Sequence, residues 1–196
     1  MTKSLHYGLT QRFEEALIYA TRLHAGQNRK GNNVPYVSHL LGVTALVLED
    51  GGDEDEAIAA LLHDAVEDQG GRETLEEIRT RFGDQVAEIV AGCTDAFVTP
   101  KPPWETRKKA YLERLPTEPK SVRRVSLADK LYNARAILAS LYAEKERTWQ
   151  RFRGGKQGTL WYYRSLAGLF LETGEDFMAV ELEKMVRRME VFDAEA

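Results

Sequence analysis

The stretch LLHDAVED, residues 61–68, places two pairs of ionisable side chains directly after an apolar run. At about 100° per residue on a helical wheel, Glu67 points between His63 and Asp64, and Asp68 lies close to Asp64. We therefore expect all four on one face of a continuous helix. An imidazole nitrogen and a carboxylate oxygen from adjacent residues can bind one divalent cation, so the stretch predicts metal ligands followed by two further acids.

The rest of the chain shows helical periodicity nearly throughout, and we find no alternation of the kind that predicts strands. The sequence therefore predicts an all-α fold, a compact helical bundle of about eight to ten helices. We expect residues 1–196 to form a single domain. The expected segments are an amphipathic helix at about 10–25, a buried helix at about 39–49, a long central helix at about 119–144, a motif-bearing core at about 10–140 and C-terminal helices at about 158–192.

Local signals set the expected helix ends. The stretches DEDE at 53–56 and TLEE at 74–77 each have the pattern of a capping box, so we expect a helix to begin at each. Gly83 is expected to end the second of these helices. Proline and glycine concentrate at 99–103 and at 154–158, and both segments are therefore predicted to be loops.

Composition excludes several classes of protein. The 196 residues carry 31 acidic and 27 basic side chains, for a net charge of −4, which argues against a nucleic-acid partner. No apolar run approaches the roughly 20 residues of a membrane span, and the N-terminus lacks the apolar core of a secretory signal, so no membrane partner is expected. The lone Cys93 excludes an internal disulfide and favours a reducing, cytoplasmic location. The oligomeric state stays open.

Basic residues gather in one part of this mildly acidic chain. Between Lys101 and Arg135 the sequence holds ten lysines and arginines in two neighbouring clusters, at 101–114 and at 120–135. Such clusters suit a small anionic ligand, although solvated helix faces are the plainer alternative for any single one of these side chains.

Two residues distant in sequence from the HD pair complete a candidate metal site. His39 begins an apolar helix, and Asp129 lies on the apolar side of the long helix, where an unpaired carboxylate is expensive. Taken singly, His39 is also explained as a hydrogen-bonded core histidine, and Asp129 by pairing with Lys130 or Arg135. Together with residues 63–64 they predict one site with mixed nitrogen and oxygen ligands, which suits manganese, iron or zinc better than calcium.

Five strings in this chain carry a resemblance to a known family. They are HAGQNRKG at 24–31, PYVSH at 35–39, LLHDAVED at 61–68, FG at 82–83 and LADKLYNAR at 127–135. In this order the chain resembles the HD-domain metal-dependent phosphohydrolases. More narrowly, it is similar to the alarmone hydrolases, which comprise the hydrolase domain of the Rel/SpoT enzymes and the stand-alone small alarmone hydrolases, including the metazoan SpoT homologue.

The resemblance implies a cofactor, a reaction and a set of site residues. It implies one divalent metal per chain, Mn²⁺ with iron or zinc as alternatives, and removal of the 3′-pyrophosphate from guanosine 3′,5′-bis(diphosphate) (ppGpp), or from pppGpp, to give GDP or GTP and pyrophosphate. The implied roles are metal ligation by His39, His63, Asp64 and Asp129, orientation or deprotonation of the attacking water by Glu67 and Asp68, and substrate binding by Arg29 (purine), Lys30 (phosphate) and Asn133 (sugar).

Departures from the family pattern leave the substrate open. Tyr132 stands where many members have histidine, and Gln69 where threonine is usual, so guanine preference is less certain than the metal chemistry. The alternatives are the same chemistry on an adenosine alarmone (ppApp or pppApp) or on another phosphorylated nucleotide, and a non-catalytic alarmone-binding module. The presence of both Glu67 and Asp68 argues against the last. The Trp-Tyr-Tyr run at 161–163 and Lys156 either line the pocket or belong to the core.

Overall fold

The computed structural model shows a helical protein. It describes residues 8–31, 33–97, 100–174 and 177–192. Within these residues the chain forms ten α-helices and two short 3₁₀ helices, and one isolated antiparallel bridge pairs Asn28 with Pro35. The all-α prediction is confirmed. Among the described helices, none has the length and apolarity that a membrane span requires.

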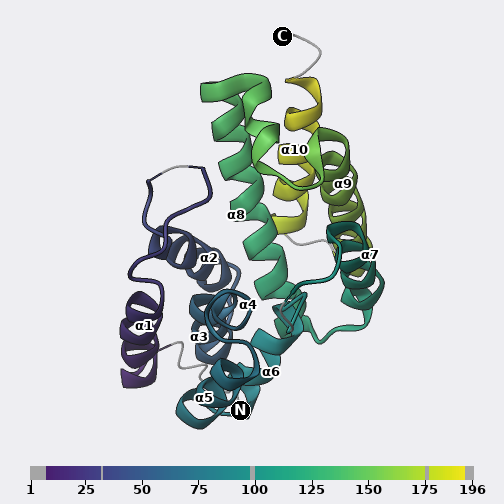
Figure 1. Cartoon of the computed structure of the whole chain (residues 1–196). Coiled ribbons are helices and arrows are strands. Elements are labelled where there is room, and N and C mark those ends of the chain that lie inside the picture. Colours follow the sequence, from purple (N-terminus) through teal and green to yellow (C-terminus); the bar gives the residue numbers. More distant parts are fainter. Residues whose placement is uncertain (1–7, 32, 98–99, 175–176, 193–196) are drawn as a thin grey trace.

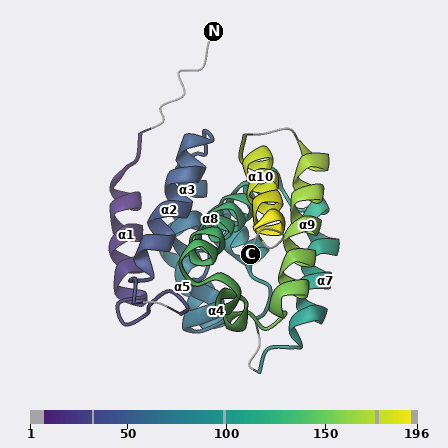
Figure 2. The same cartoon turned by 90° about the horizontal axis from the view of Figure 1, so that it is seen from above.

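One long helix organises the others. The N-terminal helices are α1 (Gln11–Leu23), α2 (Val37–Glu49), α3 (Glu54–Leu62), α4 (Ala65–Gln69), α5 (Arg72–Phe82) and α6 (Asp84–Cys93). They are followed by α7 (Trp104–Arg114), η1 (Leu115–Thr117), α8 (Lys120–Glu144), η2 (Lys145–Arg151), α9 (Gly155–Thr173) and α10 (Phe177–Val191). As Figures 1 and 2 show, α8 lies between α1–α3 on one side and α7, α9 and α10 on the other. It buries side chains toward both groups, as the periodicity predicted.

A partly buried ion cluster joins α8 to the N-terminal helices. The guanidinium of Arg124 on α8 donates to Asp50 Oδ2 at 2.8 Å and to Glu56 Oε2 at 2.6 Å. Asp50 follows α2 and Glu56 lies in the first turn of α3, so this arginine connects three helices. Glu56 also closes the predicted capping box, in which Glu56 and Asp53 exchange two hydrogen bonds of 2.9 Å. That prediction is confirmed.

The predicted second capping box is wrong. The helix begins at Arg72, and Thr74 lies within its first turn, where its hydroxyl donates to the Gln69 carbonyl. Gly70 and Gly71 have φ of 151° and 64°, a reversal that starts α5 almost directly after α4. The predicted end at Gly83 agrees with the structure.

The glycine-rich loop predicted at 154–158 is also wrong, because α9 begins at Gly155. A Cβ at Gly154 would lie 2.7 Å from the indole of Trp104, and one at Gly158 would lie 3.2 Å from it. Tertiary packing against Trp104 therefore explains these glycines better than turn formation does. The other predicted loop lies partly outside the described residues. Its described part, 100–103, is not helical and leads into α7, a helix that the sequence did not predict.

The HD pair itself lies at a helix break. The predicted continuous helix is wrong, because α3 ends at Leu62 and α4 begins at Ala65. His63 Nδ1 is 2.8 Å from the Ala60 carbonyl, so the imidazole satisfies an acceptor at the end of α3. The break directs His63 and Asp64 from a turn toward α2 and α8.

A close approach of α2 to α8 brings His39 near Asp129. A Cβ added at Gly42 would lie 1.9 Å from the ring of Tyr132, whose hydroxyl donates to the Ser38 carbonyl. The Tyr132 ring also packs at 5.3 Å from the His39 imidazole. Glycine at 42 is therefore required for this helix contact.

We expect Gly42→Ala to lower the free energy of unfolding. Overpacking of this kind costs about 1–3 kcal/mol, and the gain in helix propensity of about 1 kcal/mol offsets only part of it. Gly168→Ala is the matched control, because Gly168 lies in α9 with open space around it and should become slightly more stable. Urea unfolding of both variants checks this, and a Gly42→Ala variant as stable as the wild type would contradict it.

Candidate metal centre and its cavity

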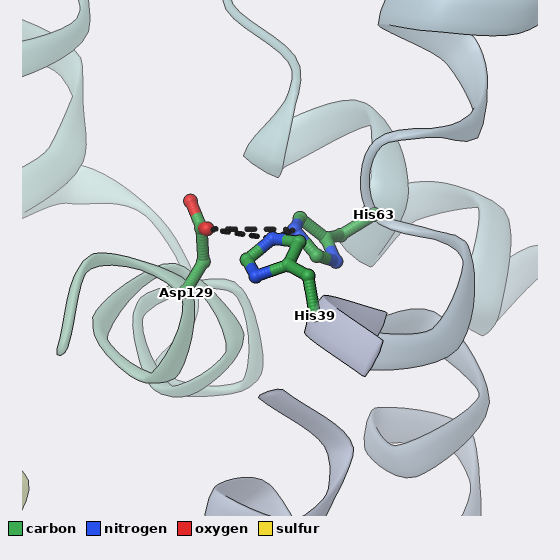
Figure 3. A group of neighbouring side chains, drawn as sticks. All are labelled: His39, His63 and Asp129. Atoms are coloured by element: carbon green, nitrogen blue, oxygen red, sulfur yellow. Dashed lines mark hydrogen bonds and ion pairs between the residues drawn. The ribbon is translucent and has the colours of Figure 1, made fainter. Parts of the chain in front are cut away.

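Three buried side chains from separate elements meet at one point (Figure 3). His39 on α2, His63 after α3 and Asp129 on α8 each offer a ligand atom, and these atoms all lie within 4.8 Å of one another. The two Nε2 atoms are 3.3 Å apart, and Asp129 Oδ1 lies 3.3 Å from that of His39 and 3.6 Å from that of His63. This spacing is that of groups able to share a cation.

The fourth predicted ligand faces the same two imidazoles. Asp64 Oδ2 lies 3.1 Å from His63 Nε2 and 3.4 Å from His39 Nε2. The structure thus brings together all four side chains that the sequence singled out. Their role as ligands stays a prediction.

The donor set fits a divalent metal ion. Because His63 Nδ1 faces the Ala60 carbonyl, the proton belongs on Nδ1 and the Nε2 lone pair points to the centre. Burial disfavours charge on Asp129, yet Lys130 and the two histidines hold the pKa of that carboxyl well below its usual range. Burial opposes charge on Asp64 as well, and His63 holds its pKa well below the usual range. Two carboxylates and two imidazole nitrogens at one point form a mixed oxygen and nitrogen donor set, which suits a first-row divalent metal.

Three polar side chains donate hydrogen bonds to the two carboxylates, Tyr36 and Asn133 to the oxygens that face the histidines and Lys130 to the other oxygen of Asp129. The Tyr36 hydroxyl donates to Asp64 Oδ2 at 2.5 Å, and burial followed by the nearby Asp64 raises the pKa of that hydroxyl, so it stays a donor. Asn133 Nδ2 donates to Asp129 Oδ1 and Lys130 Nζ to Oδ2, both at 2.5 Å. The ion pair of Asp129 with Lys130 was an alternative to metal binding, but it occupies the oxygen opposite to the one that faces the histidines.

A cavity of about 510 Å³ adjoins this centre. Tyr36, Lys130 and Asn133 line it, and so do the predicted substrate residues Arg29 and Lys30. Arg29 Nη2 donates to Asn133 Oδ1 at 2.6 Å, which ties the loop before α2 to the carboxylate on α8. The structure therefore gathers Arg29, Lys30 and Asn133 around one space. Their contact with a substrate stays a prediction.

The two acids predicted to act on water lie on α4 with different partners. Glu67 Oε1 accepts from Lys101 Nζ at 2.8 Å, and Asp68 Oδ2 accepts from Gln27 Nε2 at 2.8 Å and lines the cavity. Burial is the main cause that raises the pKa of both carboxyls, with Asp95 adding to it at Glu67 and Asp64 at Asp68. A raised pKa makes a carboxylate a stronger proton acceptor.

A side-chain network that the sequence did not predict orients Asp68. Gln27 Oε1 accepts from Gln69 Nε2 at 2.7 Å and lies 2.7 Å from His24 Nδ1, so the Gln27 amide nitrogen faces Asp68. Gln69, which departs from the usual threonine, is part of this network. The string HAGQNRKG contains His24 and Gln27, but nothing in the local sequence indicated that these side chains reach α4.

Cations and aromatic rings from the C-terminal half complete the cavity wall. The lining residues from this half that the sequence analysis did not assign to the site include Trp104, Lys108, Lys130, Arg151, Phe152 and Thr159. Tyr162 and Tyr163 line the cavity and are also buried, so both interpretations of the aromatic run hold for them. Trp161 lines a separate groove, and Lys156 pairs with Glu146 at 3.2 Å. Arg151, Phe152 and Thr159 were missed because only packing brings them to α8, whereas Lys108 and Lys130 belong to the basic clusters noted in the sequence.

Helices that direct two histidines and two aspartates to one point, beside a cavity rich in cations, define the class of metal-dependent phosphohydrolases with an HD centre. Comparison with known families agrees. The model of the HD domain matches residues 16–160, and this chain belongs to the HD domain family.

Known relatives narrow the comparison. The chain is 42% identical over 126 residues to guanosine-3′,5′-bis(diphosphate) 3′-pyrophosphohydrolase MESH1 of Xenopus tropicalis and 40% identical to that of Homo sapiens. Each match covers 63% of this chain and 68% of the relative. Among solved structures, a metazoan ortholog of SpoT, described as hydrolysing ppGpp, superposes with a TM-score of 0.74 at 26% identity, covering 92% of this chain and 97% of that one.

Removing the Tyr36 hydroxyl should weaken metal binding. Tyr36→Phe leaves Asp64 without its donor, and loss of such a supporting hydrogen bond typically costs about 10- to 100-fold in metal affinity. Calorimetric titration with Mn²⁺ measures this. Tyr142→Phe is the control, since the exposed Tyr142 contacts Arg188 near the end of α8 and should leave affinity unchanged. Equal affinity in Tyr36→Phe and the wild type would contradict the expectation.

Proposed function

We propose that this protein is an Mn²⁺-dependent hydrolase that removes the 3′-pyrophosphate from ppGpp or pppGpp, giving GDP or GTP and pyrophosphate. The observation that carries the proposal is the group of two histidines and two aspartates at one end of a cavity lined by Arg29, Lys30, Lys108 and Lys130. The activity of its MESH1 relatives supports the same reaction.

The proposed metal ligands are His39, His63, Asp64 and Asp129. A divalent ion there would polarise a phosphoryl oxygen and make water a nucleophile near neutral pH. Nitrogen and oxygen donors suit Mn²⁺, with iron or zinc as alternatives. With four such residues on one centre, we propose one metal per chain rather than a two-metal clamp.

Glu67 and Asp68 are proposed to serve the attacking water. The carboxylates lie one helical turn past the HD pair, and their nearest polar partners are Lys101 for Glu67 and Gln27 for Asp68. A positioned carboxylate that takes a proton from water typically contributes about 10²–10⁴-fold to the rate. Lys101 lowers the pKa of Glu67 against the effect of burial, and the amide of Gln27 orients Asp68.

Arg29, Lys30 and Asn133 are proposed to hold the nucleotide. The Arg29 guanidinium lies 5.7 Å from the Tyr36 ring centroid, so a planar group that can stack already borders the cavity. Lys30 contributes charge for phosphate. Asn133 forms hydrogen bonds with both Arg29 and Asp129. It would therefore link the position of the nucleotide to the metal centre.

Lys108 and Lys130 suit the departing pyrophosphate. Lys130 Nζ is bonded to Asp129, and Lys108 Nζ lies 2.7 Å from Asp95 Oδ2 and lines the same cavity. Ammonium groups at the metal end stabilise charge that develops on the leaving group.

We further propose that residues 1–196 act as one domain, since α8 packs against helices of both halves. A cytoplasmic location and the absence of a nucleic-acid partner remain predictions from the sequence.

Product identification tests the substrate directly. Purified protein with Mn²⁺ is incubated with guanosine and adenosine 3′,5′-bis(diphosphates), and nucleotides and pyrophosphate are separated by anion-exchange chromatography. The proposal expects GDP and pyrophosphate from ppGpp. Faster turnover of ppApp, or release of inorganic phosphate in place of pyrophosphate, would move the assignment to the alternative substrates.

Two substitutions separate metal binding from proton transfer. We expect Asp64→Ala to lose both bound metal and turnover, because it removes a ligand. Glu67→Ala should keep the metal and lose about 10²–10⁴-fold in kcat. Metal content by mass spectrometry and kcat with ppGpp measure the two effects. Near-normal turnover in Glu67→Ala would show that Glu67 has another role.

The pH dependence should respond to Lys101. Burial and Asp95 raise the pKa of Glu67, and Lys101 lowers it, so removal of this cation must raise it further. Since Glu67 is proposed to act ionised, the acidic limb of kcat should move to higher pH in Lys101→Met. Lys109→Met is the control, because Lys109 is exposed and pairs with Glu105. An unshifted limb in Lys101→Met would exclude Glu67 as the titrating base.

A further inference from the structure

We propose that Arg151 determines specificity by binding the 5′-phosphate end of the substrate, at the end of the cavity opposite the metal centre. This inference rests on the proposed function. It assigns the part of the same site that distinguishes a nucleotide phosphorylated on both its 3′ and 5′ oxygens from one phosphorylated at the 3′ position alone.

Arg151 lies where two cavities meet. It ends η2, and its side chain lines both the main cavity and a neighbouring one of about 330 Å³. Arg29, Ala136 and Ser140 line both spaces as well. A group on this shared wall can contact a ligand that fills the main cavity, and the side chain is 19% exposed.

The guanidinium is far from the metal centre along α8. Arg151 Nη1 lies 3.5 Å from Ser140 Oγ, three helical turns after Asp129. At 1.5 Å per residue this is about 16 Å along the helix axis. Lys108 and Lys130 provide charge at the metal end, and Arg151 provides it at the other. A substrate with diphosphates on both its 3′ and its 5′ oxygens matches this distribution.

The loop that carries Arg29 and Lys30 is shaped to admit the Arg151 side chain. Gly31 has φ of 83°, and a Cβ there would lie 2.4 Å from Arg151 Nε. The arginine therefore crosses directly over the backbone of the proposed nucleotide-binding loop. This close approach is at Gly31, the residue directly after Lys30, and both Lys30 and Arg151 line the main cavity.

The present partner of Arg151 leaves donors for a phosphate. Its Nη2 forms an ion pair with Glu144 Oε2, whose side chain is 39% exposed, and its Nη1 is at the limit of hydrogen bonding to Ser140. A guanidinium has five N–H donors, and two of them can bind a phosphate side by side. Phosphate carries more charge than one carboxylate, so it competes well for this arginine.

The test compares two substrates that differ only at the 5′ position. Wild type, Arg151→Ala and Arg151→Lys are assayed with ppGpp and with guanosine 3′-diphosphate bearing a free 5′-hydroxyl. In Arg151→Ala we expect KM for ppGpp to rise about 10- to 100-fold, the loss of one charge-assisted hydrogen-bonding group, with KM for the 5′-hydroxyl substrate unchanged. Arg151→Lys should recover part of the affinity for ppGpp alone.

Two controls make the outcome decisive. Arg153→Ala removes an exposed arginine two residues away and should change neither KM. Thermal unfolding shows whether each variant is folded. Equal losses on both substrates in Arg151→Ala would mean that Arg151 only braces the loop, and no change on either would also overturn the assignment. A wild type that turns over neither substrate would instead overturn the proposed function itself.

Discussion

Two carboxylates held against the same pair of imidazole nitrogens are the constraint on which this structure depends. Asp64 and Asp129 both lie 3.1–3.6 Å from the Nε2 atoms of His39 and His63, and Asp129 and both histidines are buried. Ionised groups leave water only when a cation or strong donors compensate them. The contacts that fix α2, the turn after α3 and α8 relative to one another, including the Arg124 cluster, therefore position the centre as well as stabilise the fold.

The groups around the carboxylates connect the metal centre to the loop before α2, which carries Arg29 and Lys30. Asn133 donates to Asp129 and accepts from Arg29, so one amide bridges a proposed ligand and a proposed nucleotide contact. Gln27, two residues before Arg29, similarly reaches Asp68 on α4. A shift of the segment before α2 would change both the pocket and the acid that faces it. Side-chain hydrogen bonds thus connect the proposed nucleotide contacts to the proposed metal ligand and to Asp68.

The sequence predicted the centre better than the local structure around it. His39 and Asp129 stood out because polar groups on apolar helix faces need a partner, and that argument does not depend on exact helix ends. The helix break at residues 63–64 was missed because it comes from a side chain bonding the Ala60 carbonyl, which periodicity does not report. The segment 154–158 was misread as a loop, because α9 begins at Gly155 and the glycines at 154 and 158 pack against the indole of Trp104, about fifty residues earlier. The sequence around Arg151 did not indicate a site residue, because only the packing of η2 brings its side chain to the loop at Gly31.

The distribution of charge, rather than its total, explains how an acidic protein can bind a polyanion. The net charge is −4, yet Arg29, Lys30, Lys108, Lys130 and Arg151 all line one cavity with Asp68 as the acid among its lining residues. Screening limits exposed charges to about 8–10 Å at physiological salt, so surface acids farther away contribute little inside. Buried cations that already face carboxylates, as Lys108 faces Asp95 and Lys130 faces Asp129, are held in place before the ligand arrives. The free energy needed to bring these cations close together is then supplied by folding. The cavity therefore presents a preorganised positive field to the phosphates.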